Sequence, residues 1–174
     1  MEAAGENEML EKKENILVSA CLLGINCRYT GTGTLLEEFV SLKENYNLIP
    51  VCPEIYGGLA TPRDPAEQIE NKVVTVNGED VTEAYQRGAE EILQLAKFYG
   101  CKTAILKERS PSCGFGKIYD GTFTHTIIDG NGITAELLAQ NGIQILGETQ
   151  IDCMRPKVAD GDKNDGKTTG STIK

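Results

Sequence analysis

The sequence predicts an α/β fold, a single Rossmann-like domain with a mainly parallel sheet and helices on both faces. Short apolar runs alternate with segments of helical periodicity along most of the chain. Such alternation is typical of parallel sheets whose strands are connected through helices. The length of 174 residues suits one domain, and the sequence contains no internal repeat. We therefore expect one core organised around one sheet.

Four apolar runs predict the strands of this sheet, because each is short, aliphatic and followed by polar or turn-forming residues. They cover residues 16–20, 48–51, 103–107 and 143–146. Pro50 lies inside the second run and cannot donate a backbone hydrogen bond, so we expect that strand at an edge. Turn sequences also predict a strand at 72–76 and a hairpin at 117–128.

Helical periodicity predicts three helices, at residues 34–43, 80–99 and 133–140. The second is the most clearly marked, because Asp80 and Glu83 form a capping-box pattern at its start. Gly100 follows its last apolar residue and is a natural C-terminal cap. Glycines and prolines between residues 55 and 67 indicate an irregular loop there.

Composition sets the domain boundaries and excludes some functions. We expect a flexible lead at 1–15, a folded domain at 16–150 and a disordered tail at 151–174, because both ends are polar. The net charge of −9, from 26 acidic and 17 basic residues, argues against a broad nucleic-acid-binding surface. There is no membrane-spanning run and no signal-peptide pattern, so the expected compartment is the cytoplasm.

The six cysteines lie at positions 21, 27, 52, 101, 113 and 153. In a reducing cytoplasm they are more typical of metal-binding, catalytic or buried thiols than of disulfides. Cys21 follows the first predicted strand, Cys52 follows the second, and Cys113 follows the third through the loop 106–114. Ligands of open parallel sheets bind at the carboxyl ends of the strands. We therefore expect these three thiols to face one crevice.

Three convergent thiolates suit a zinc ion or an iron–sulfur cluster. Both prefer four ligands, so three protein ligands would leave one position open, as in catalytic metal sites. The alternative is that the three are buried apolar cysteines, which is the usual state of a cytosolic cysteine. No CxxC motif is present, and the residues by themselves leave both interpretations open.

Four segments closely resemble the YbbK-like family, once catalogued as a domain of unknown function, whose characterised branch is the thiouracil desulfidases. They are Ser19-Ala20-Cys21-Leu22-Leu23-Gly24, Pro50-Val51-Cys52-Pro53-Glu54, Gly57-Gly58-Leu59-Ala60-Thr61-Pro62-Arg63 and Leu106-Lys107-Glu108-Arg109-Ser110-Pro111-Ser112-Cys113-Gly114. The resemblance extends over nearly the whole predicted domain, from Ile16 to Leu146. Taken together, the four motifs are highly specific.

The resemblance implies a chemistry and a set of residues. Members of that branch bind a 4Fe-4S cluster through three cysteines, leave one iron without a protein ligand, and convert the C=S group of a thiouracil to C=O. On this chain the ligands would be Cys21, Cys52 and Cys113, and the catalytic pair would be Glu54 and Ser110. The carboxylate would activate water or move protons, and the hydroxyl would relay a proton or orient the ring.

Arg63, Lys107 and Ser112 are further candidates for contacts with the substrate. Arg63 would either bind an anion or form a salt bridge with Glu54 or Glu67. Lys107 lies at a predicted strand end, where it would line the pocket or be solvated.

Other residues are expected to lie outside the chemistry. Cys27 is interpreted as a packed or semi-exposed thiol, because the ligand set of the family does not need it. Cys101 opens the third strand at its far end, and Cys153 adjoins the tail. His125, the only histidine, is interpreted as a strand residue without a ligand role.

The leading hypothesis is an iron–sulfur-dependent, non-redox desulfidase that acts on a thiolated pyrimidine base or nucleoside. The acidic composition favours a small molecule over nucleic acid, while thiolated tRNA stays an open alternative. Two other hypotheses are a non-catalytic carrier that donates sulfide or its cluster to a partner, and a zinc–thiolate protein. The missing fourth ligand and the adjacent Glu54 argue against the zinc protein.

Overall fold

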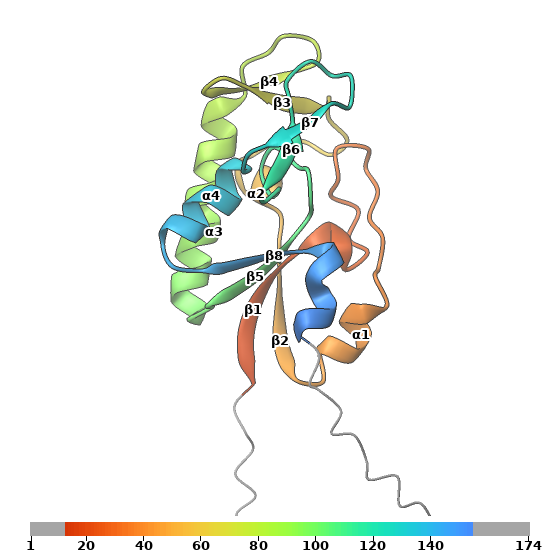
Figure 1. Cartoon of the computed structure of the whole chain (residues 1–174), viewed down its shortest axis with the longest axis vertical. Helices are drawn as coiled ribbons and strands as arrows, with labels where there is room; N and C mark the ends of the chain where they lie inside the picture. Colours follow the sequence, from red (N-terminus) through yellow and green to blue (C-terminus); the bar gives the residue numbers. More distant parts are fainter. Residues whose placement is uncertain (1–12, 155–174) are drawn as a thin grey trace, which may run out of the picture.

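The computed structural model describes residues 13–154 and has a four-stranded parallel sheet at its centre (Figure 1). The strands follow the order β2-β1-β5-β8, and every pair in the sheet is parallel. Their bounds are β1 (Glu14–Ser19), β2 (Tyr46–Val51), β5 (Thr103–Leu106) and β8 (Gln144–Gly147). The predicted α/β architecture is confirmed, and all four predicted sheet strands form.

Helices cover both faces of the sheet (Figure 1). On one face, α3 (Thr82–Tyr99) and α4 (Ile133–Gln140) pack over a core that includes Leu17, Ile92 and Leu138. On the other, α1 (Glu38–Leu42) and the 3-10 helix η2 (Glu148–Met154) enclose a second core that includes Phe39 and Ile151. Because the strands are buried on both sides, they are nearly continuous apolar runs, as parallel strands usually are.

The strand β2 lies at the edge of the sheet, as Pro50 predicts. Pro50 pairs in register with Val18 of β1. A proline has no backbone N–H, so a position inside the sheet would leave a neighbouring carbonyl without its donor.

Two antiparallel hairpins stand beyond the carboxyl ends of the strands (Figure 1). One pairs β3 (Ala66–Ile69) with β4 (Lys72–Thr75), and the other pairs β6 (Lys117–Tyr119) with β7 (Ile127–Asp129). The second hairpin and the strand β4 agree with the prediction. The strand β3 falls partly in the segment predicted as irregular, because its sequence Ala-Glu-Gln-Ile lacks β-branched residues except at its end.

The long helix α3 begins two residues later than predicted, and the expected capping box is wrong. Val81 is the N-cap, and no side chain caps the helix. Asp80 lies one residue before it and accepts hydrogen bonds from the backbone N and Oγ1 of Thr82, at 3.1 and 2.6 Å. The C-terminal prediction is confirmed, because Gly100 adopts the left-handed conformation and its N–H bonds to the Ala96 carbonyl.

Three short helical segments differ from the expectation. The 3-10 helix η1 (Ala20–Leu22) and the helix α2 (Pro53–Tyr56) were not predicted, and α1 is shorter than the predicted 34–43. Helices this short carry too little periodicity to be recognised in sequence. The element η2 continues to Met154, into the segment assigned to the tail, while residues 1–12 and 155–174 lie outside the described range. Within residues 13–154, α3 and the other helices are too short or too polar to cross a membrane.

Candidate active site

A cavity of about 680 Å³ lies at the carboxyl end of the sheet, and all three predicted cysteine ligands line it. Cys21 lies in η1 directly after β1, and Cys52 is the N-cap of α2 directly after β2. Cys113 lies in the loop that follows β5. The parallel order of the strands therefore gathers three thiols that are far apart in the sequence, as the topology predicts.

The loop that carries Cys113 is held by its own hydrogen bonds. The hydroxyl oxygen of Ser110 accepts from the backbone N–H groups of Ser112 and Cys113, each at 3.1 Å. The N–H of Gly114 donates to the Ser110 carbonyl at 2.8 Å, and a Cβ at Gly114 would lie 2.8 Å from that oxygen. Only glycine fits this approach, so the loop fixes both Ser110 and Cys113 relative to the strand end.

Glu54 and Ser110 face each other across the cavity, with Ser110 Oγ 3.5 Å from Glu54 Oε1. Arg63 pairs with the other carboxylate oxygen, Oε2. The two charged side chains are largely buried, at 14% exposed for Glu54 and 10% for Arg63. Of the two outcomes expected for Arg63, the salt bridge with Glu54 is the one that forms.

The Arg63 guanidinium also anchors two segments of the cavity wall. It donates to Ala60 O and Thr61 Oγ1, each at 3.1 Å, and to the Cys27 carbonyl at 3.1 Å. Its Nε is buried and has no hydrogen-bond partner among the described residues. A buried donor without a partner costs free energy, so the Arg63 side chain is held by the hydrogen bonds of its two other nitrogens.

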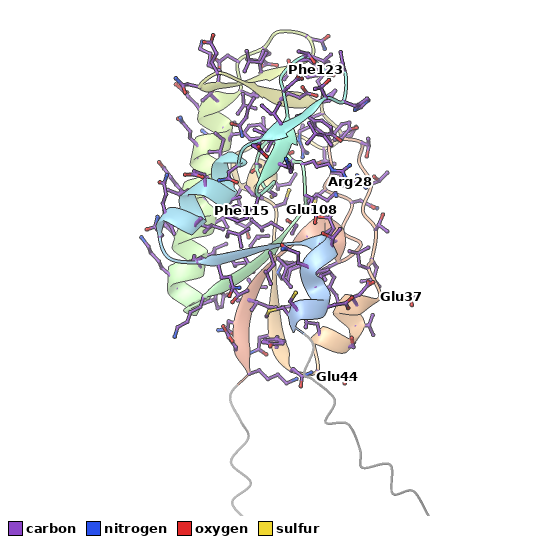
Figure 2. The ribbon with its side chains drawn as sticks, in the orientation of Figure 1. Arg28, Glu37, Glu44, Glu108, Phe115 and Phe123 are labelled. Atoms are coloured by element: carbon purple, nitrogen blue, oxygen red, sulfur yellow. The ribbon has the colours of Figure 1, made fainter. Side chains whose placement is uncertain are left out.

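A second ion pair closes the opposite wall. Lys107 donates to Glu148 Oε1, and the second oxygen of Glu148 accepts from the backbone N–H of Glu108. Glu108 in turn accepts from the N–H and hydroxyl of Thr149. These contacts hold the start of η2 against the end of β5, and both Glu148 and Thr149 line the cavity. Glu108 and two other lining residues, Arg28 and Phe123, are labelled in Figure 2.

Cys27 lies closer to the predicted ligands than its assignment as a bystander implies. It is buried, lines the cavity, and its thiol forms hydrogen bonds with the thiols of Cys21 and Cys52. Its carbonyl accepts from Arg63 and, at 3.8 Å, from Cys52 Sγ. The signal for this placement is its position in the loop that leaves Cys21, only six residues further along.

Burial and neighbouring thiols raise the pKa values of these cysteines. The hydrogen bond with Cys21 is the largest cause for Cys27, whose pKa rises to about 11. The hydrogen bond with Cys27, followed by burial, raises the pKa of Cys52. Burial, followed by the charge of Glu54, raises the pKa of Cys113 to about 12. At neutral pH the metal-free thiols of Cys52 and Cys113 are therefore protonated, and binding of iron has to release their protons.

The donor set fits an iron–sulfur cluster. Each cysteine ligand of such a cluster binds a separate iron, so the thiols need to surround a shared space rather than meet at one point. Cys21, Cys52 and Cys113 approach the cavity from three different elements, which is such an arrangement. Between residues 13 and 154, no three His, Cys, Asp or Glu side chains converge as ligands of a single metal ion do.

The structure places the other predicted residues in different ways. Lys107 lines the cavity, but Ser112 is fully buried and its hydroxyl bonds to that of Thr134 at 2.9 Å. Ser112 therefore does not reach the cavity as expected. Cys101 and Cys153 are absent from its lining, and Cys153 is exposed.

Several lining residues were missed, above all the loop between β6 and β7. Phe123 and His125 lie in this loop with φ values of 58° and 62°, and both line the cavity. His125 is thus not the strand residue expected. The loop is held by buried Glu67, which accepts from the N–H groups of Gly121 and Phe123 at 2.9 and 3.1 Å. Tyr85 of α3 also lines the cavity, although helical periodicity predicts it only as a core residue.

Comparison with known proteins agrees with this geometry. The chain is 45% identical over 147 residues to the protein YbbK of Bacillus subtilis (strain 168), covering 79% of this chain and 97% of that protein. It also resembles a solved structure, the [4Fe-4S]-dependent thiouracil desulfidase TudS (DUF523Vcz). The TM-score is 0.78 at 44% sequence identity, over 82% of this chain and 95% of that one.

The sequence model of one family matches residues 16–150, which include β2, β5, β8 and every proposed site residue. The description of that family is 2-thiouracil desulfurase. The match covers most of the chain and agrees with both relatives. The chain therefore belongs to the 2-thiouracil desulfurase family.

Proposed function

We propose that this protein is a [4Fe-4S]-dependent desulfidase that hydrolyses the C=S group of a thiolated pyrimidine to C=O and releases sulfide. The observation that supports it most is the meeting of Cys21, Cys52 and Cys113 with Glu54 and Ser110 in one cavity. The reaction consumes one water and yields one hydrogen sulfide, so it needs no electron acceptor or donor.

Three of the cavity thiols would hold the cluster. Cys21, Cys52 and Cys113 each come from a different element, and one iron would keep no protein ligand. The bound cluster would supply a soft Lewis acid for the sulfur of the substrate. Tight local packing fixes the ligands, because Cys113 is set by the Ser110 turn and Cys52 is set by the start of α2.

Glu54 is the group best placed to activate water. Its Oε2 is occupied by Arg63, which leaves Oε1 directed at Ser110 and the cavity. A carboxylate oriented in this way can accept a proton from water as the oxygen attacks the ring carbon. Arg63 thus holds the base in place.

Ser110 is the candidate for proton transfer. Two backbone N–H groups already donate to its oxygen, so its own hydrogen is free to point at Glu54 or at the substrate. The hydroxyl can therefore pass a proton between the carboxylate and the ring. The separation of 3.5 Å from Glu54 Oε1 allows this with a small movement.

Charged groups on the wall would help to hold a small polar substrate. Arg63 and Lys107 both line the cavity, and each is paired with a carboxylate, Glu54 and Glu148 respectively. Because the chain carries a net charge of −9, a small thiolated pyrimidine suits it better than RNA does.

The test is anaerobic reconstitution followed by turnover of 2-thiouracil. We expect about four irons per chain and formation of uracil and sulfide in equal amounts. Glu54→Gln should keep its iron and lose about 10²- to 10⁴-fold in kcat, because it loses the base and keeps the ligands. A protein that binds iron fully but releases no sulfide without an added acceptor protein would contradict the enzyme and favour a carrier.

A further inference from the structure

Tyr85 lies at the cavity among the residues proposed for the chemistry, although it comes from a helix rather than a strand end. Its side chain is only 3% exposed, and it lines the cavity from α3. Burial raises its pKa, and so does the nearby charge of Glu54, while the charge of Arg63 opposes them. The phenol is therefore close to these groups and stays protonated, which makes it a hydrogen-bond donor at neutral pH.

Close packing of α3 against α2 fixes the position of Tyr85. A Cβ at Gly88 would overlap the Pro53 carbonyl oxygen, and a Cβ at Gly57 would overlap the Ala84 carbonyl oxygen. Arg87 adds a hydrogen bond from Nε to the Gly57 carbonyl at 3.1 Å. Pro53 directly precedes Glu54, and Ala84 directly precedes Tyr85. The packing of α2 against α3 therefore positions both side chains.

No hydrogen bond of the Tyr85 hydroxyl is found among residues 13–154, where Arg63 Nε is the fully buried side-chain polar atom that lacks a partner. Glu54 is occupied by Arg63 and Ser110, and Glu67 is occupied by the β6–β7 loop. The Tyr85 hydroxyl therefore keeps some exposure, and the cavity is the surface that this side chain lines. A hydroxyl that lines a cavity and lacks a partner in the protein is placed to donate to a ligand.

We propose that Tyr85 is a specificity-determining residue, whose hydroxyl donates a hydrogen bond to the ring carbonyl oxygen that the reaction leaves unchanged. This inference rests on the proposed function, because it concerns how the same cavity orients a thiolated pyrimidine. A ring that carries both C=S and C=O would satisfy the buried phenol. A thione ring without the second oxygen would leave the phenol unpaired and bind more weakly.

The test combines Tyr85→Phe with ligands that do or do not carry the second oxygen. Dissociation constants of uracil and of pyrimidin-2-one, which lacks the 4-oxo group, are measured by calorimetry on the cluster-loaded protein. We expect Tyr85→Phe to weaken uracil binding about tenfold, as for one lost neutral hydrogen bond, and to change pyrimidin-2-one binding less than about twofold. In the same variant, kcat/KM for 2-thiouracil should fall by about the same factor as the affinity for uracil.

Tyr99→Phe is the matched control, because Tyr99 ends the same helix far from the cavity and its ring contacts only Phe98 among described aromatic rings. It should leave both constants unchanged. Equal effects of Tyr85→Phe on the two ligands, or no effect on uracil, would overturn the inference. Failure of the wild-type protein to release sulfide from 2-thiouracil would instead refute the proposed function, so the two failures are distinguishable.

Discussion

At the scale of single residues, the thiol of Cys27 lies beside two of the three proposed ligands and is hydrogen-bonded to both. Such a thiol has two explanations. It is either a fourth ligand of the cluster or a hydrogen-bond donor to the sulfurs of the ligands. Cys27 lies in the loop beyond η1 and not directly after a strand, as Cys21 and Cys52 do, so we favour the second explanation. Hydrogen bonds to cluster sulfurs are one of the factors that tune such sites.

We therefore expect Cys27→Ala to keep the iron that the ligand variants lose. Cys21→Ala, Cys52→Ala and Cys113→Ala each remove a thiolate, so each should fail to hold a stable cluster after reconstitution. The measurement is iron and sulfide content per chain together with the visible absorbance of the cluster. Cys101→Ala is the control, since that thiol is outside the cavity. Loss of iron in Cys27→Ala equal to that in Cys113→Ala would show that Cys27 is a ligand.

At the scale of elements, the site depends on how closely α3 packs against α2. Gly88 is buried in this contact, where a Cβ would overlap the Pro53 carbonyl. Alanine is normally the better helix former by about 1 kcal/mol, so helix propensity alone favours the substitution. The overlap with backbone atoms outweighs this gain, because a backbone cannot rotate away as a side chain can.

Gly88→Ala should therefore destabilise the fold by about 1–3 kcal/mol and also reduce turnover, because it shifts α2 with Glu54 away from α3 with Tyr85. Urea unfolding and steady-state kinetics on the same sample provide the measurement. Gly78→Ala is the control: no atom lies near its Cβ, and its φ of 85° costs about 1–2 kcal/mol. Normal kinetics in Gly88→Ala would show that the contact does not position the site.

The elements also show what could be predicted from the sequence. Apolar runs located all four sheet strands, and the parallel topology then brought Cys21, Cys52 and Cys113 to one edge. Side chains at strand ends are predictable because their direction follows from the sheet. Glu54, two residues beyond Cys52, is another example.

Residues that reach the cavity by tertiary packing could not be predicted in the same way. Tyr85 has the spacing of a core residue, and only the tilt of α3 decides that its hydroxyl meets the cavity. The sequence around His125 is typical of a strand. In the structure this segment is a loop, which Glu67 of the other hairpin holds by a hydrogen bond. Ser112 is adjacent to Cys113 but turns inward to Thr134. In each case the partner is distant in sequence, so local pattern carries no signal.

At the scale of the whole molecule, the site brings together three segments. Each segment follows a different strand of the sheet. Cys21 belongs to η1, Cys52 to the start of α2, and Cys113 to the loop after β5. A cluster bound by all three would act as a crosslink in the folded state alone, since the unfolded chain does not hold the thiols together. Such binding stabilises the folded state in proportion to the logarithm of its affinity.

Removing the iron should therefore lower the melting temperature of the whole domain. Binding at 100 times the dissociation constant adds about 2.7 kcal/mol, and each kcal/mol shifts Tm by about 2–4 °C at this chain length. We expect the metal-free protein to melt about 5–10 °C lower, measured anaerobically by calorimetry before and after chelation. Glu54→Gln should show nearly the same shift as wild type, whereas Cys113→Ala should show none. An unchanged Tm on chelation of wild type would mean that the three segments are not bridged by the cluster.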